Sequence, residues 1–181
     1  IGNNNYLLND ESINSEPKDI TPLLQATLKA WDDDLKNTSI LIIEKIKDSK
    51  AKKIASSAAI LKWSPDESKF LYKEKPLSDK EKDGIILFKD YKVYDLEDKI
   101  QYNIPEARAF SWLPDSRHVI LVEEDKVSIF DFDGSNKAVI YAGKFEDSFV
   151  FAWPDASRLV VVSSLPTPTA SEPNLFGINL K

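Results

Sequence analysis

The sequence predicts an all-β fold of about four short antiparallel sheets, because one motif recurs along the chain. In each copy an apolar segment ends near a Trp, a turn follows, and a second apolar segment begins after a short polar stretch. Short apolar segments bounded by turn residues are typical of strands. All 4 tryptophans of the chain fall in copies of the motif, which chance similarity would rarely produce. The residues assigned to the repeat are Trp31, Trp63, Pro65, Asp66, Trp112, Pro114, Asp115, Trp153, Pro154 and Asp155.

Each residue type of the motif has a physical role. Pro fixes φ at the first corner of a turn, and Asp accepts hydrogen bonds from nearby backbone amides. Trp packs as a bulky wedge between neighbouring sheets, where its burial contributes about 2–3 kcal/mol. We therefore expect the four tryptophans to occupy equivalent, largely buried positions at the ends of inner strands.

The first predicted unit, residues 19–56, holds the weakest copy of the motif. Thr21 and Pro22 could begin a helix in residues 19–30, since the leucines that follow and Trp31 have helical spacing. The alignment of the repeats favours instead a strand that ends at Trp31. The β-branched run of residues 38–47 predicts a buried strand after it.

The second unit, residues 57–106, is expected to begin with an inner strand over residues 54–63. Its second strand contains the apolar residues 70–72, and the charged insert of residues 73–83 predicts an exposed loop. Further strands are expected over residues 85–88, 93–94 and 100–104. The third unit, residues 107–147, has the clearest pattern, with strands over 107–112, 119–123, 127–132 and 138–142. Asp133-Gly134 between the last two is a strong hairpin signal.

The fourth unit, residues 148–181, predicts strands over 149–153, 159–163 and 175–180. Three prolines place a surface loop over residues 165–174, because Pro fixes φ and removes a backbone donor. No fourth strand follows. Residues 1–18 are expected to form one short strand, at residues 6–8, and a loop. Either this strand pairs beside residues 175–180, or missing sequence or a second chain covers the open edges.

The repeated turns resemble those of a known class of protein. Trp63-Ser-Pro-Asp66, Trp112-Leu-Pro-Asp115 and Trp153-Pro-Asp155 are similar to the Trp-Ser-Pro-Asp-Gly turn of TolB-like and other WD-type β-propellers, over roughly residues 30–181. More narrowly, the chain resembles the propeller repeats attached to PEGA domains in some bacterial surface proteins. This resemblance implies a small β-propeller, or a propeller-like arc of a larger ring.

The chain departs from that pattern at two points of the turn. Glu67, Ser116 and Ala156 stand where the resemblance implies glycine, and no residue separates Trp153 from Pro154. These departures bear on the geometry of the turns and leave the repeat itself intact.

Composition narrows the classes of partner. The formal net charge is −6 and the isoelectric point is near 4.9, so the average surface repels a phosphate backbone, and no nucleic-acid partner is expected. No apolar run is long enough for membrane insertion. Cys is absent, which excludes disulfides and zinc–thiolate sites. The chain begins with Ile, so we expect a processed product or a part of a longer protein, with an extracytoplasmic or cell-surface location favoured.

Three features of the sequence have both a chemical and a structural interpretation, and we favour the structural one for each. His118 is the single histidine and is expected to be structural or exposed. Residues 131–136 resemble the start of a calcium loop, but Ala142 stands where the last acidic ligand belongs, so a hairpin turn explains them better. The acidic triplet 32–34 is expected to be a solvated turn. Catalytic, cofactor-binding and metal-ligating residues are therefore predicted to be none.

We expect a non-catalytic module of a larger protein that binds a protein, peptide or glycan. Two alternatives remain open at this point. One is an accessory propeller that filters substrate for a hydrolase domain outside this sequence. The other is a structural assembly subunit, favoured if self-association or a second chain completes the sheets.

Overall fold

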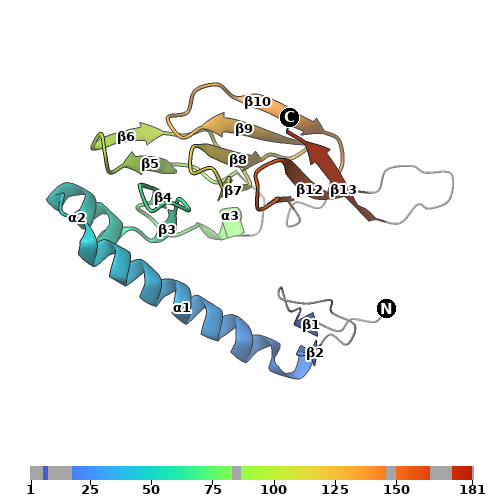
Figure 1. Ribbon diagram of the computed structural model, residues 1–181, viewed down its shortest axis with the longest axis horizontal. Helices are drawn as coiled ribbons and strands as arrows, with labels where there is room; N and C mark the ends of the chain where they lie inside the picture. Colours follow the sequence, from blue (N-terminus) through green and yellow to red (C-terminus); the bar gives the residue numbers. More distant parts are fainter. Residues whose placement is uncertain (1–5, 8–17, 83–86, 146–149, 164–172, 181) are drawn as a thin grey trace. The chain divides into compact units, whose positions relative to one another are not determined.

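The computed structural model describes residues 6–7, 18–82, 87–145, 150–163 and 173–180. The chain divides into two compact units, Ile1–Lys45 and Ile46–Lys181, and each is described by itself (Figure 1). None of the helices in these ranges combines the length and the apolar content needed to span a membrane.

The first unit is mainly helical. Strand β1 (Tyr6–Leu7) pairs antiparallel with β2 (Lys18–Asp19), and a short 3-10 helix, η1 (Thr21–Leu23), leads into the long helix α1 (Leu24–Lys45). The predicted strands ending at Trp31 and over residues 38–47 are therefore wrong, and the helix that Thr21 and Pro22 could begin is the one that forms. The N-terminal patch pairs with Lys18–Asp19 and not with residues 175–180.

Local interactions explain why a helix forms here. The Asp19 carboxylate accepts a hydrogen bond from the Thr21 amide at 2.9 Å, and Pro22 lies in the first turn, where its missing N–H has no cost. No Pro-Asp turn follows Trp31, so nothing reverses the chain. The preference of β-branched residues for strands is weak and yields to this context.

The second unit begins with helix α2 (Ser49–Ser57), which Asp48 caps by accepting the Ala51 amide hydrogen bond at 2.7 Å. The inner strand predicted over residues 54–63 starts only at Ile60, because α2 takes its first part. Three antiparallel sheets follow, and in each the strands are hydrogen-bonded in chain order (Figure 1). Their strands are β3 (Ile60–Trp63), β4 (Lys69–Lys73), β5 (Lys92–Asp95) and β6 (Ile100–Asn103); β7 (Ala109–Trp112), β8 (His118–Val122), β9 (Lys126–Asp131) and β10 (Ala138–Ala142); and β11 (Val150–Ala152), β12 (Arg158–Ser163) and β13 (Asn174–Asn179).

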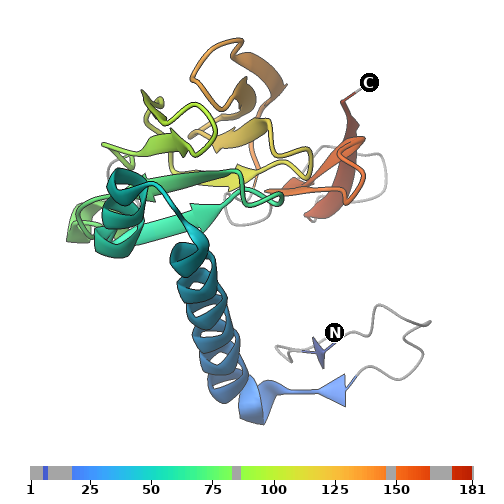
Figure 2. The same cartoon turned by 60° about the vertical axis from the view of Figure 1, so that its left-hand side comes forward.

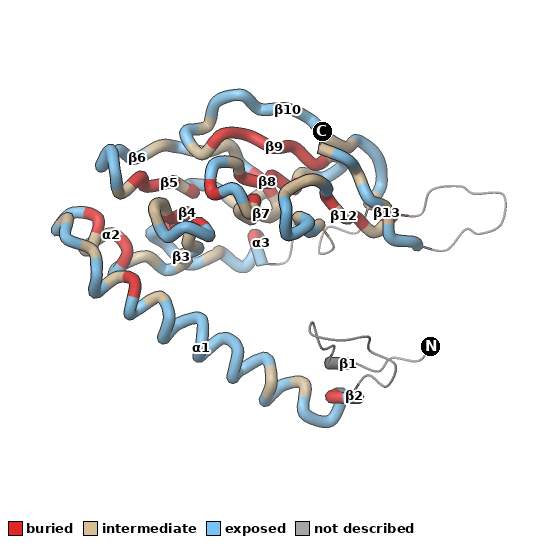
Figure 3. Tube along the Cα trace, in the orientation of Figure 1, coloured by how far each residue is buried: buried red, intermediate tan, exposed pale blue. Residues whose placement is uncertain are grey.

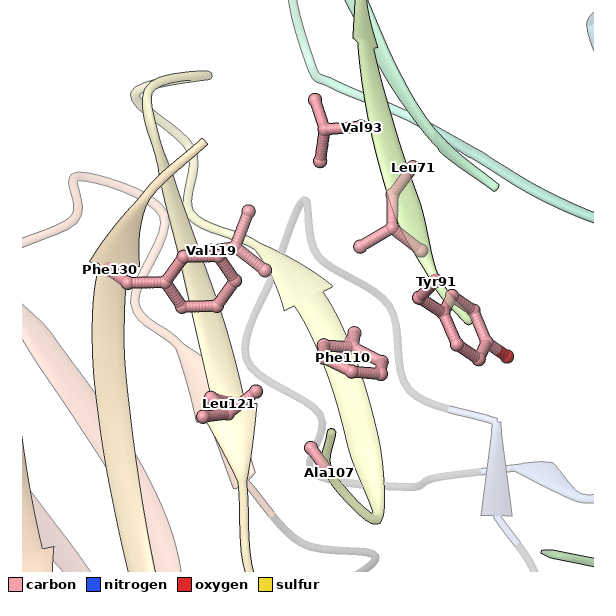
Figure 4. Packing of buried hydrophobic residues seen from close by; sticks show 8 residues of the cluster. All are labelled: Leu71, Tyr91, Val93, Ala107, Phe110, Val119, Leu121 and Phe130. Carbon is pink, nitrogen blue, oxygen red and sulfur yellow. The ribbon is translucent and has the colours of Figure 1, made fainter. Parts of the chain in front are cut away.

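The sheets pack face to face in succession. We call the face that a sheet turns toward the next sheet its leading face, and the opposite face its trailing face. Leu71 and Val93 on the leading face of the first sheet pack against Phe110, Val119 and Phe130 on the trailing face of the second (Figure 4). The leading face of the second sheet then packs against Leu159 of the third through its apolar residues, Leu113, Ile120, Val122, Val127 and Ile129.

Burial follows this stacking, with the fully buried segments in the middle strands of the first two sheets (Figure 3). A succession of meander sheets with buried inter-sheet layers is the architecture of a β-propeller arc. The predicted propeller-like arc is confirmed, with three sheets in the described ranges and helices in place of the first unit.

The charged insert after β4 is more ordered than an exposed loop. Lys73 and Glu81 are both buried, and the Lys73 Nζ lies 2.9 Å from Glu81 Oε1. Glu81, in helix α3 (Asp79–Lys82), also accepts hydrogen bonds from the Ser78 amide at 2.7 Å and the Lys89 amide at 3.2 Å. Most of the second predicted loop, residues 165–174, lies outside the described residues.

Breaking this ion pair should destabilise the unit. The hydrogen bond from Lys73 outweighs burial, with help from the amides of Ser78 and Lys89, and lowers the pKa of Glu81 to about 2. The pair therefore stabilises the fold above the ordinary glutamate pKa of 4.5, and this contribution is lost as the pH falls from there toward 2. At neutral pH we expect Glu81→Gln to cost about 3 kcal/mol, because it leaves Lys73 buried without its carboxylate.

The measurement is urea unfolding of both proteins between neutral and acidic pH, in which the difference should shrink below the glutamate range. Asp79→Asn is the matched control on the same helix, because the Asp79 side chain is 95% exposed, and it should change stability by less than about 0.5 kcal/mol. A difference that stays constant with pH would contradict the assignment.

Candidate interaction surface

The Pro-Asp turns keep one geometry in all three sheets without the glycine that the resemblance implies. The amide of Glu67 donates to the Ser64 carbonyl oxygen at 2.9 Å, and Ser116 and Ala156 donate to the corresponding carbonyls at 3.1 and 2.8 Å. These three donor residues have φ of 59°, 59° and 56°, the left-handed region that favours glycine.

The Asp of each turn holds the chain after the corner. Asp66, Asp115 and Asp155 each accept a hydrogen bond from the amide two residues later, at 3.0, 3.0 and 2.9 Å. Burial opposes ionisation of Asp66, but hydrogen bonds from Ser64 and Ser68 outweigh it and lower the pKa of this carboxyl. The Asp therefore substitutes for the missing glycine by offsetting the backbone strain.

Glycine at one such corner should stabilise the protein. Ala156→Gly removes the strain of a Cβ at positive φ, and we expect a gain of about 0.5 kcal/mol. Ala142→Gly, the same change at an exposed strand position, should instead cost about 0.5–1 kcal/mol. Thermal unfolding of both variants checks the pair, and a loss of stability in Ala156→Gly would contradict a strained turn.

The hydrogen bonds of the turns also show which tryptophans are equivalent. Leu113 and Trp153 hold the same place, because each carbonyl accepts the bond that closes the turn. Trp112 is therefore equivalent to Ala152, and the residue missing before Pro154 shifts Trp153 by one position. A shift of one residue in a strand turns the side chain to the opposite face.

The four tryptophans are consequently not equivalent, and the prediction that all are largely buried is wrong. Trp31 lies in α1 and Trp153 is 51% exposed. Trp63 and Trp112 are half-buried on trailing faces. The Trp112 indole Nε1 donates to the Lys62 carbonyl oxygen of the preceding sheet at 3.0 Å, so it links two sheets directly.

Replacing the two tryptophans should separate these roles. Trp112→Phe loses the hydrogen bond to the first sheet, and we expect a cost of about 1 kcal/mol. Trp153→Phe should change stability by less than about 0.5 kcal/mol. Urea unfolding measures both, and equal losses would contradict the shift of Trp153.

The leading face of the third sheet carries exposed apolar side chains. Phe151 is 55% exposed and Leu175 is 71% exposed, whereas Val127, which holds the Leu175 position in the second sheet, is fully buried. We call this surface the open face; its residues are Phe151, Trp153, Val160, Val162 and Leu175. Beside it, β13 has no strand on its outer side in the described ranges, whereas β5 and β9 pair there with β6 and β10.

The other end of the arc is covered. Phe70, Tyr72 and Tyr94 on the trailing face of the first sheet are fully buried, and α2 lies beside them (Figure 2). The Tyr94 hydroxyl lies 3.5 Å from Asp48 Oδ1, and Lys50 Nζ lies 5.9 Å from the centre of the Tyr94 ring. Burial and the nearby Asp48 carboxylate raise the pKa of Tyr94. Helix α2 thus takes the place of a preceding sheet.

A cavity of about 320 Å³ lies between the second and third sheets. His118 stands at its polar end, with Nδ1 2.6 Å from Asp115 Oδ2 and Nε2 3.1 Å from Asp131 Oδ1. Burial opposes ionisation of Asp115, but hydrogen bonds from the amide and ring of His118 outweigh it and lower the pKa of Asp115. Sequence reasoning missed this site, because its lining comes together only when the second and third sheets pack against each other.

The remaining candidates have structural explanations. Residues 131–136 form the β9–β10 turn, in which Gly134 has φ of 89° and donates to the Asp131 carbonyl at 2.8 Å. The acidic triplet 32–34 lies within α1 rather than in a turn. Among the residues that the structure describes, no group of three or more His, Asp or Glu side chains could hold a metal ion.

The arc of sheets places the chain in the class of β-propeller-like proteins. Neither a protein-family model nor a curated protein matches its sequence. Among solved structures it is similar to the β-propeller domain of the Trilobed protease from Pyrococcus furiosus, with 18% identity over 68% of this chain and 41% of that one, at a TM-score of 0.43. TolB from Acinetobacter baumannii (15% identity, 66% and 29% coverage, TM-score 0.41) and the acylaminoacyl peptidase of Pyrococcus horikoshii (14%, 69% and 25%, 0.37) are also similar. The chain spans less than half the length of each.

Proposed function

We propose that this chain is a non-catalytic interaction module of a larger protein, and that it binds its partner on the open face. The observation that carries the proposal is the exposure of Phe151, Trp153 and Leu175 on one sheet face. Exposed apolar side chains gathered on a single face are typical of surfaces that bind another protein. An extracytoplasmic or cell-surface location goes with this proposal, on the resemblance of the turns to those of surface proteins.

The partner that fits the open face is another antiparallel sheet. In both interfaces within the chain, a leading face packs on the trailing face of the next sheet. Val160 and Val162 hold the positions of Ile120 and Val122, which the third sheet buries. The open face therefore repeats the pattern that already binds a sheet, and the unpaired edge of β13 offers a partner strand its backbone groups.

In this proposal a partner sheet can be added to the arc only at the third sheet and not at the first. Helix α2 covers the trailing face of the first sheet, so a second partner has no equivalent apolar surface there. A second copy of this chain could offer its own open face to the first. This geometry differs from the leading-to-trailing packing within the chain, and we therefore favour a sheet with a trailing face as the partner.

The test supplies such a sheet. A second copy of residues 132–181 is fused after Lys181, so that its first segment provides an outer strand beside β13 and its β11–β13 equivalent provides a trailing face. We expect Trp153 of the original copy to become shielded from solvent. The added copy carries Trp153→Phe, so that this position is reported only once. The ring of the original Trp153 is followed by fluorine NMR of the protein labelled with 5-fluorotryptophan. Quenching by acrylamide should fall about twofold or more, in proportion to the loss of an exposed ring.

The control carries Leu159→Asp and Val161→Asp in the added copy only, which spoils its trailing face. Shielding of Trp153 in the control as strong as in the test protein would show non-specific collapse and contradict the proposal. Unchanged Trp153 exposure in both would overturn it as well. Sedimentation of the unextended chain measures self-association directly, and a dimer abolished by Leu175→Asp would assign the open face to a second copy instead.

A further inference from the structure

We propose that the cavity between the second and third sheets is a binding site for a tyrosine side chain of a partner protein. It is separate from the open face, which lies on the opposite side of the third sheet. The lining is apolar over most of its surface, with Leu113, Ile129 and Leu180 among its walls, and polar at the end formed by Asp115, His118 and Asp131.

The first interface of the same chain shows what normally fills this place. Strand pairing gives Tyr102 and Ala138 the same position, because they pair with Val93 and Ile129 in the middle of equivalent strands. Phe132 and Leu180 also hold equivalent positions, because Phe132 directly follows β9 and Leu180 directly follows β13, the third strands of their sheets. In the first interface Tyr102 and Phe132 meet edge to face, with ring centres 5.7 Å apart.

The second interface lacks both rings. Ala138 and Leu180 stand in their places, and each lines the cavity. An alanine and a leucine thus stand where the first interface has two aromatic side chains, and no neighbour among the described residues fills the space. The missing volume is that of aromatic rings, and a partner that supplies a ring restores the packing of the first interface.

The polar end selects among aromatic side chains. In the first interface Lys69 occupies the His118 position, and its Nζ lies 4.7 Å from the centre of the Phe132 ring and 4.0 Å from Asp95 Oδ2. In the second interface the His118 ring holds this place, with Nε2 3.1 Å from Asp131 Oδ1. Asp115, whose side chain is 36% exposed, still has acceptor capacity toward the cavity.

A tyrosine satisfies both ends of the cavity. Its ring fits between Ile129 and Leu180, and its hydroxyl donates a hydrogen bond to the Asp115 carboxylate. Phenylalanine would bring the ring without this additional hydrogen bond. Sites built to hydrogen-bond a hydroxyl discriminate strongly against analogues that lack it.

The inference extends the proposed function and depends on it only in taking the occupant to be a protein side chain. It is tested with p-cresol, which is the side chain of tyrosine, and with toluene, the side chain of phenylalanine. Nitrogen–proton correlation spectra of the full chain follow each titration. We expect p-cresol to bind with a dissociation constant in the millimolar range, as ligands of this size do, and to shift the amide signals of Ala138, Ala156 and Leu180. Toluene should bind about tenfold more weakly.

Two pairs of variants complete the test. Ala138→Tyr places a ring in the cavity from within, so it should abolish p-cresol binding and raise the unfolding midpoint by about 2–4 °C. Val139→Tyr adds the same ring on the other face of the same strand, at a side chain that is 54% exposed, and should leave binding unchanged. Asp115→Asn should weaken p-cresol about fivefold and leave toluene unaffected, whereas Asp133→Asn, an acidic residue outside the lining, should affect neither.

Equal binding of toluene and p-cresol would overturn the assignment to tyrosine. Shifts confined to the open face, or binding that survives Ala138→Tyr, would overturn the cavity as the site. Leu175→Asp tests the open face alone, so loss of partner-sheet packing with p-cresol binding intact separates the two proposals. If Asp115→Asn fails to fold, the comparison of p-cresol with toluene on the unmodified chain still decides the outcome.

Discussion

Packing of one sheet face on another is the constraint on which the second unit depends. Each sheet is short and apolar on both faces, so each needs a neighbour on both sides. The second sheet has two such neighbours, and its residues Val119, Ile120, Leu121 and Phe130 are nearly or completely buried. The first and third sheets have one sheet neighbour each, and their outer faces show two different solutions to the same problem.

Helix α2 is the solution at the first sheet. Its alanines, Ala51 and Ala55, are buried, and Asp48 and Lys50 at its start lie near the side chain of Tyr94. One polar atom shows that the replacement is imperfect. The Trp63 indole Nε1 is buried and has no hydrogen-bond partner in the part of the chain that the structure describes, whereas the equivalent Nε1 of Trp112 donates to the carbonyl of Lys62. Trp63 therefore holds the position from which Trp112 links two sheets, but a helix and not a sheet lies on that side of it.

The third sheet has no cover on its leading face among the described residues, and the interface behind it is incompletely filled. Both features arise from small changes in an otherwise repeated pattern. The loss of one residue before Pro154 moves Trp153 to the open face, and the exchange of two aromatic rings for Ala138 and Leu180 opens the cavity. The repeat thus keeps its backbone hydrogen bonds while its side chains diverge, which is how a structural unit acquires binding surfaces.

The sequence by itself determined most of the strands, the order of the sheets and the Pro-Asp turns of the second unit. These depend on local chemistry, because alternating apolar residues and the restricted φ of Pro act within a few residues of one another. It also contained the helical alternative at Thr21 and Pro22, which the alignment of Trp31 with the other tryptophans overrode. Trp31 shares its residue type with the other tryptophans but not their position.

Only the tertiary structure decided which face each tryptophan occupies, what covers the first sheet and where the cavity lies. A shift of one position in a strand turns a side chain to the opposite face. Trp153-Pro154-Asp155 is visibly one residue shorter than the other turns, but the sequence does not show which residue's carbonyl accepts the hydrogen bond that closes this turn. The buried pair of Lys73 and Glu81 was hidden for a related reason. The charges of this insert predict a solvated loop, because the sequence does not show that the fold buries Lys73 and Glu81 as an ion pair.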